Sequence, residues 1–78
     1  MKPVVTEKAV MMIERENVLT FETNREKSKD AIKKEIEELF GIKVKKIRSF
    51  VRGNKKYIYV KLKKEFPAID IATRLGLM

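Results

Sequence analysis

The segment 43–64 carries the residues whose types and spacing favour one particular chemistry, the binding of a polyanion. It holds ten basic side chains and no acidic one, whereas the rest of the chain has nine basic and eleven acidic residues. The net charge of +8 therefore comes from this segment. A concentrated basic patch attracts polyanions, and RNA or DNA is the first candidate. The ten residues are Lys43, Lys45, Lys46, Arg48, Arg52, Lys55, Lys56, Lys61, Lys63 and Lys64.

A two-residue turn at Gly53-Asn54 is predicted to set the residues of this segment opposite one another. Glycine at the first position of such a turn is typical of a type II′ hairpin. Because side-chain direction alternates along a strand, the pairs across the hairpin share one face. We expect the pairs Arg52 with Lys55, Phe50 with Tyr57, Arg48 with Tyr59, and Lys46 with Lys61. We expect the opposite face to be a core face with Ile47, Ser49, Val51, Ile58, Val60 and Leu62.

Three aromatic rings flanked by basic side chains indicate a surface for RNA. Nucleobases stack on aromatic rings with about 1–3 kcal/mol per base, and arginine forms bidentate contacts with phosphate or guanine. Two simpler interpretations stay open. The rings would pack beneath a helix, or the lysines would only be solvated surface.

Other charged residues allow weaker interpretations. Lys27, Lys29 and Lys33 lie at or near the start of a predicted helix, and they form either a second phosphate site or a solvated surface. The glutamates within residues 35–38 are most simply the outer face of that helix. Adjacent side chains on a helix point apart, which disfavours a catalytic pair of carboxylates there.

The composition argues against catalysis. The chain has no cysteine and no histidine, and its three glycines stand far apart. It therefore lacks thiolate chemistry, the commonest general base, the commonest metal ligand and a glycine loop for phosphate. We expect no enzyme activity, no cofactor and no metal site. No apolar run approaches the ~20 residues of a membrane helix, and the start of the chain does not resemble a signal peptide. We therefore expect a cytoplasmic protein without membrane insertion.

The alternation and spacing of apolar residues predict a single α+β domain over residues 1–78. The expected order is helix-strand-helix-strand-strand-helix, with helices packed on a small antiparallel sheet of three to four strands. The strands are expected at residues 18–23, 42–52 and 55–64, and residues 3–5 could add a short edge strand.

The three helices are predicted from caps and apolar stripes. Thr6 and Ser28 suit N-caps, Asn17 and Gly41 suit helix ends, and Pro67 suits the first helical position. The stripes are Ala9, Met12 and Ile13 in the first helix, Ile32, Ile36, Leu39 and Phe40 in the second, and Ile69, Ala72 and Leu75 in the third.

Several segments, taken in order, resemble a known family. Residues 3–9, with the sequence PVVTEKA, resemble the N-terminal motif of the universal large-subunit ribosomal protein family L-twenty-three. The similarity continues through the turn and helix of residues 27–40, the hairpin and the closing residues 71–76, and so spans essentially the whole chain.

The resemblance implies a structural constituent of the large ribosomal subunit that binds its rRNA near the exit of the polypeptide tunnel. It also implies neighbouring ribosomal proteins, a docking platform for signal recognition particle and the protein-conducting channel, and a monomer within the ribosome. Glu7 matches the glutamate that bacterial relatives use to dock a chaperone, and it fits equally well as a first-turn acid that the helix dipole favours. The two-residue loop Gly53-Asn54 is similar to archaeal members and too short to line the tunnel as the long bacterial loop does.

The candidate RNA-binding residues combine the hairpin pattern with the resemblance. The alternative function is a non-ribosomal basic module that docks an acidic protein. The candidates are Lys8, Lys27, Lys29, Lys46, Arg48, Phe50, Arg52, Asn54, Lys55, Lys56, Tyr57 and Tyr59, with Glu7 as the candidate for factor docking.

Overall fold

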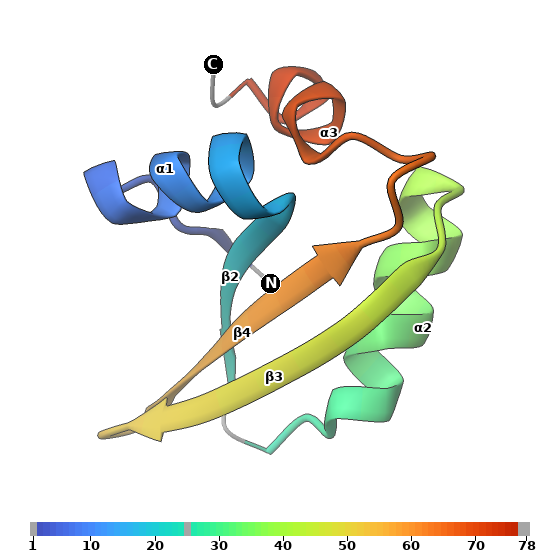
Figure 1. Cartoon of the computed structure of the whole chain (residues 1–78). Coiled ribbons are helices and arrows are strands. Elements are labelled where there is room, and N and C mark those ends of the chain that lie inside the picture. The colour runs from blue at the N-terminus through green and yellow to red at the C-terminus, as the bar shows by residue number, and fades with distance from the viewer. Residues whose placement is uncertain (1, 25, 77–78) are drawn as a thin grey trace.

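The structure is a computed structural model that describes residues 2–24 and 26–76. Within these residues, four strands and three helices form the α+β fold that the sequence predicted (Figure 1). The elements are β1 (Lys2–Pro3), α1 (Glu7–Glu16), β2 (Val18–Asn24), α2 (Lys29–Phe40), β3 (Val44–Arg52), β4 (Lys55–Leu62) and α3 (Ala68–Arg74).

The four strands form one antiparallel sheet in the order β1-β2-β4-β3. The short edge strand expected at residues 3–5 is present at Lys2–Pro3, where it pairs with β2. A backbone hydrogen bond of 3.0 Å from Val4 to Thr20 continues that pairing. Because β4 lies between β2 and β3, its residues determine which side chains of both neighbours share a face.

The β3–β4 hairpin has the predicted register. Arg52 lies opposite Lys55, and the three further predicted pairs are also present. Gly53 has a φ of 64°, as the first position of a type II′ turn requires. A β-bulge between Val44 and Lys46 shifts the register beyond the last of these pairs, so that Val44 lies opposite Leu62.

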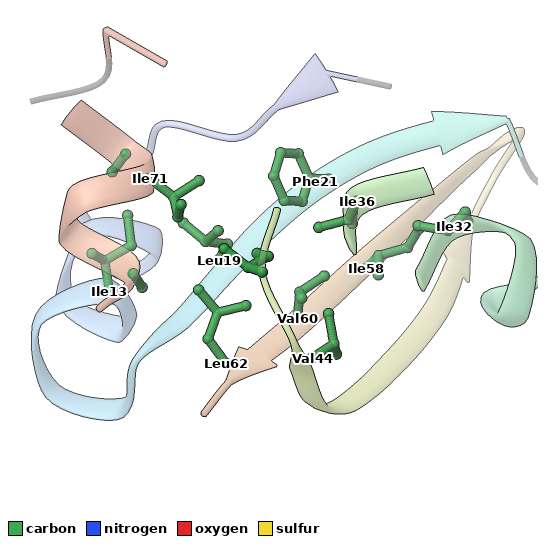
Figure 2. Close-up of a cluster of buried hydrophobic side chains, with 13 residues drawn as sticks. Ile13, Leu19, Phe21, Ile32, Ile36, Val44, Ile58, Val60, Leu62 and Ile71 are labelled. Carbon is green, nitrogen blue, oxygen red and sulfur yellow. The ribbon is translucent and has the colours of Figure 1, made fainter. Parts of the chain in front are cut away.

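The hydrophobic core lies between one face of the sheet and the helices (Figure 2). Ile58 and Val60 from the central strand are fully buried, as are Ile32 and Ile36 from α2. Burying each of these branched side chains contributes about 1.5–3 kcal/mol to stability. The rest of the cluster is Ile13, Leu19, Phe21, Ile42, Val44, Leu62, Ala68, Ile71 and Ala72.

Three predicted core positions are wrong. Leu39 is 67% exposed, because α2 packs through the narrower stripe of Ile32 and Ile36, with Phe40 half-buried beside the core. Ile69 is 45% exposed because it lies about 100° around α3 from the buried Ala68. Pro67 is the N-cap of this helix and not its first helical residue. Ala68, Ile71 and Ala72 form the buried stripe instead. On the hairpin, Val51 is 49% exposed near the turn.

The helix caps confirm the local predictions. The Thr6 hydroxyl accepts the N–H of Ala9 at 3.1 Å, and the Ser28 hydroxyl accepts the N–H of Ala31 at 3.2 Å. Gly41 follows α2 with a φ of 63°. These bonds satisfy amide groups that a helix end would otherwise leave without a partner.

Asn17 does more than end α1. Its backbone adopts a left-handed φ of 58°, its N–H donates to Met12, and its carbonyl accepts the N–H of Leu62 at 3.1 Å. Its side-chain Nδ2 lies 3.2–3.3 Å from the carbonyl oxygens of Leu62, Lys63 and Phe66. Its Oδ1 accepts the N–H of Ala68, the first residue of α3. One side chain therefore joins the end of α1 to the β4–α3 connection.

We predict that Asn17→Ala destabilises the fold by about 3 kcal/mol, because it removes several hydrogen bonds of about 0.5–1.5 kcal/mol each and strains a left-handed residue. Asn17→Gly keeps the left-handed backbone and should lose about 2 kcal/mol. Urea unfolding followed by circular dichroism measures both. If Asn17→Gly were as stable as the wild type, the hydrogen bonds of the Asn17 side chain would not contribute to stability, and only the backbone conformation would matter.

Candidate nucleic-acid interface

The sheet has a second face, on the side away from the core, which we call the aromatic face. The register places Lys46, Arg48, Phe50 and Arg52 of β3 on this face together with Lys55, Tyr57, Tyr59 and Lys61 of β4, and Thr20 and Glu22 of β2 join them. This grouping follows from the two-residue period of strands, since directly opposite residues point to the same side.

The aromatic rings form one contiguous cluster. Phe50 and Tyr57 are stacked, with ring centroids 5.2 Å apart and an interplanar angle of 18°. Tyr59, also on β4, is tilted against Phe50, with ring centroids 5.4 Å apart and an interplanar angle of 41°. The guanidinium of Arg52 lies 5.9 Å from the centroid of the Phe50 ring, within cation–π range. Phe50 is 36% exposed and the two tyrosines are half-buried, so the rings remain at the surface and do not join the buried core.

A groove of about 450 Å³ runs between these rings and the N-terminal part of the chain. One wall is formed by Lys2, the residues leading into α1, and Lys8 of α1. The other wall includes Tyr57 and Tyr59. Thr20 lines the groove and is 8% exposed; its hydroxyl oxygen has no hydrogen-bond partner within the described residues. A second groove, lined by Lys46, Arg48 and Lys61 among others, shares Met12 and Tyr59 with the first.

Glu22 is the acidic residue of the aromatic face, and sequence reasoning did not select it. Its Oε1 lies 3.0 Å from Nζ of Lys55. The hydrogen bond to this carboxylate, together with its charge, raises the pKa of Lys55 above its usual value. The alternation of residues 18–23 placed Glu22 opposite the core side chains, but its position beside Tyr57 depends on β2 pairing with β4.

Three of the candidate lysines lie away from the aromatic face. Lys56 is on the core side of the hairpin, where its Nζ donates to the carbonyl of Lys27 at 2.6 Å. Lys27 forms an ion pair of 3.2 Å with Glu35. Lys29 is exposed at the start of α2. Lys27 and Lys56 therefore hold the loop before α2 against the hairpin.

The remaining candidate residues are exposed at separate places. Asn54 lies in the turn at the tip of the hairpin, and Glu7 lies in the first turn of α1. Among the glutamates that we placed on the outer face of α2, Glu37 has a structural contact, because its Oε2 accepts the N–H of Val44 at 2.9 Å.

The residues described by the structure contain no group of three or more His, Cys, Asp or Glu side chains that could hold a metal ion. The helices in this part of the chain are too short and too polar to span a membrane. A small α+β domain with aromatic rings and cations on one open sheet face is typical of nucleic-acid-binding proteins.

The comparison with known proteins identifies the family. The family model described as "Ribosomal protein L23" matches residues 1–67. A relative named large ribosomal subunit protein uL23, from Picrophilus torridus, is 43% identical over 75 residues, which are 96% of this chain and 92% of the relative. The chain therefore belongs to the ribosomal protein L23 family. It is a ribosomal protein of the large subunit and not an enzyme, as the sequence predicted.

The two faces of the sheet predict losses of stability of different size for two phenylalanine substitutions. Phe21 is 2% exposed on the core side, so Phe21→Ala should cost about 3–5 kcal/mol or leave the chain unfolded. Phe50→Ala should cost about 1 kcal/mol, the value of its aromatic contacts. Thermal unfolding followed by circular dichroism compares them. Equal losses would show that the rings of the aromatic face belong to the core.

Proposed function

We propose that this protein binds large-subunit ribosomal RNA through the aromatic face. The observation that carries the proposal is the clustering of Arg48, Arg52 and other cations around three surface rings on one side of the sheet. Basic residues opposite basic residues repel each other in an isolated sheet. Phosphates lying along this face relieve that repulsion, and binding then consists of neutralising many phosphates at once.

The candidate residues divide into three roles within this proposal. Lys8, Lys46, Arg48, Arg52 and Lys55 contact phosphates around the aromatic face. Phe50, Tyr57 and Tyr59 offer stacking surfaces to bases, which is how many proteins hold unpaired RNA. A secondary contact around the hairpin tip comes from Lys27, Lys29, Lys56 and Asn54. It is secondary because Lys27 and Lys56 are already engaged within the protein.

We extend the proposal to the position near the exit of the polypeptide tunnel and to factor docking. The surface of α1 supports this part, because Glu7, Met11 and Arg15 line one groove on this helix, and Met11 is 38% exposed. A surface with an apolar side chain between charges suits protein docking. When RNA covers the aromatic face, this surface of α1 stays open to signal recognition particle or the protein-conducting channel. The protein acts as a monomer among neighbouring ribosomal proteins.

The salt dependence of RNA binding tests the electrostatic mechanism. With six phosphate contacts, the logarithm of the affinity should fall with the logarithm of the salt concentration at a slope of about −4 to −5. The double variant Arg48→Gln/Arg52→Gln removes two contacts and should reduce the slope by about 1.5. Fluorescence anisotropy with a labelled rRNA fragment measures the slope.

The matched control is Lys34→Gln/Arg74→Gln, which removes the same charge from exposed positions on α2 and α3. It should leave the slope within about 0.5 of the wild type, since its charges lie outside the aromatic face. A near-zero slope for the wild type, or the same reduction in both double variants, would contradict binding through this face.

The identity of the RNA is tested by a pull-down of the tagged protein from a lysate of the source organism, followed by sequencing of the bound RNA. We expect enrichment of one compact region of large-subunit rRNA, and loss of that enrichment in Arg48→Gln/Arg52→Gln. Indiscriminate RNA, or none, would contradict the proposal and favour a basic module that docks an acidic protein.

A further inference from the structure

We propose that the groove beside the aromatic face holds one unstacked guanine nucleotide of the bound RNA, with Glu22 reading the Watson–Crick edge of its base. This inference rests on the proposed function and goes beyond it, because it names the nucleotide and the side chain that selects it.

The groove has the size and lining of a nucleotide site. Its volume of about 450 Å³ falls within the ~300–1,000 Å³ typical of small-ligand pockets. Phe50, Tyr57 and Tyr59 line one side of it, and Lys2, Lys8 and Arg52 supply positive charge around it. A planar base suits the rings, and a phosphate suits the lysines and the arginine.

Rings in such a groove favour an unpaired base over a duplex. The bases of an A-form duplex are stacked on one another, and the duplex offers mainly phosphates and 2′-hydroxyls to a protein. If a duplex were bound, the stacked pair of Phe50 and Tyr57, with ring centroids 5.2 Å apart, would have no base to contact. A base turned out of a loop or a bulge can stack on exposed rings.

A carboxylate on this face needs a role other than phosphate binding. Glu22 is the acidic residue among β2, β3 and β4, and it lines the groove that the cations surround. Its negative charge repels a phosphate at short range. A carboxylate is an acceptor for hydrogen bonds, and a base offers donors at its edge. Glu22 therefore favours contact with a base.

The Glu22–Lys55 pair matches one base better than the others. Guanine presents two adjacent donors, N1–H and N2–H, followed by the acceptor O6. The carboxylate of Glu22 accepts from both donors, and the ammonium of Lys55, held 3.0 Å from Oε1, is placed to donate to O6. Adenine, cytosine and uracil each place an acceptor where the carboxylate needs a donor.

The chain offers an optical signal for this site. It has two tyrosines and no tryptophan, and both tyrosines line the groove. The experiment uses five RNA hairpins that differ at one bulged position, which carries guanine, adenine, cytosine, uracil or no base. Tyrosine emission reports stacking in the groove, and fluorescence anisotropy gives the dissociation constants at fixed salt.

We expect the guanine bulge to bind about tenfold more tightly than the other four, the usual discrimination of a bidentate contact. It should also quench tyrosine emission most. Glu22→Gln should abolish the preference for guanine, because an amide offers one donor and one acceptor, and each of the four bases presents a donor beside an acceptor at its Watson–Crick edge. The salt slope should not change. The matched control Glu38→Gln, exposed on α2, should keep the guanine preference.

Each outcome decides between the two proposals. Equal affinity of the wild type for all five RNAs, with the steep salt slope retained, would overturn the guanine site and leave RNA binding by the aromatic face intact. Tighter binding of Glu22→Gln to all five RNAs alike would also overturn it, since the carboxylate would then act only as a repelling charge. The absence of binding to any RNA would overturn the proposed function itself.

Discussion

The side-chain amide of Asn17 fixes the relation between the two ends of the fold. It binds carbonyls of Leu62, Lys63 and Phe66 and the first N–H of α3, while its backbone ends α1. The backbone carbonyl of Asn17 also accepts the N–H of Leu62, so α1, β2, β4 and α3 meet at one residue. Figure 1 shows α1 and α3 together at this end of the sheet. Because α1 also contributes to the wall of the groove, the position of Lys8 relative to the aromatic rings depends on this junction.

The sheet separates the core residues from the candidate binding residues through the period of two residues along β4. Ile58 and Val60 point into the core, and Tyr57 and Tyr59 point to the aromatic face. A slip of one residue in the pairing would exchange these sets and bury the tyrosines. The type II′ turn at Gly53 holds the register from one end, and the contact from Lys56 to the carbonyl of Lys27 supports it from the side. Substitutions on the aromatic face can therefore test the proposed RNA binding without disturbing the core.

Features determined by a few neighbouring residues could be predicted from the sequence, and features that depend on distant pairing could not. The caps Thr6 and Ser28 and the hairpin register are local, and the structure confirms them. The stripe of α3 was misplaced because Ala68 and Ile69 are both apolar, and choosing the wrong one of two neighbours turns the predicted face by about 100°. The positions of Glu22 beside Tyr57 and of Lys56 beside Lys27 follow from strand order and loop packing, which no local pattern reveals.

A carboxylate among cations separates affinity from selectivity. Phosphate contacts give affinity that falls steeply with salt and is the same for every sequence. A hydrogen bond to a base edge carries the sequence information. In the binding mode that we propose, the two kinds of contact come from the same face, since Glu22 is paired with Lys55 and lies in the groove that Arg52 also lines. The ion pair keeps the carboxylate oriented and offsets part of its repulsion of phosphate. A face made of cations alone would bind RNA as tightly or more tightly, but it would lack the acceptor that meets the N1–H and N2–H donors of guanine.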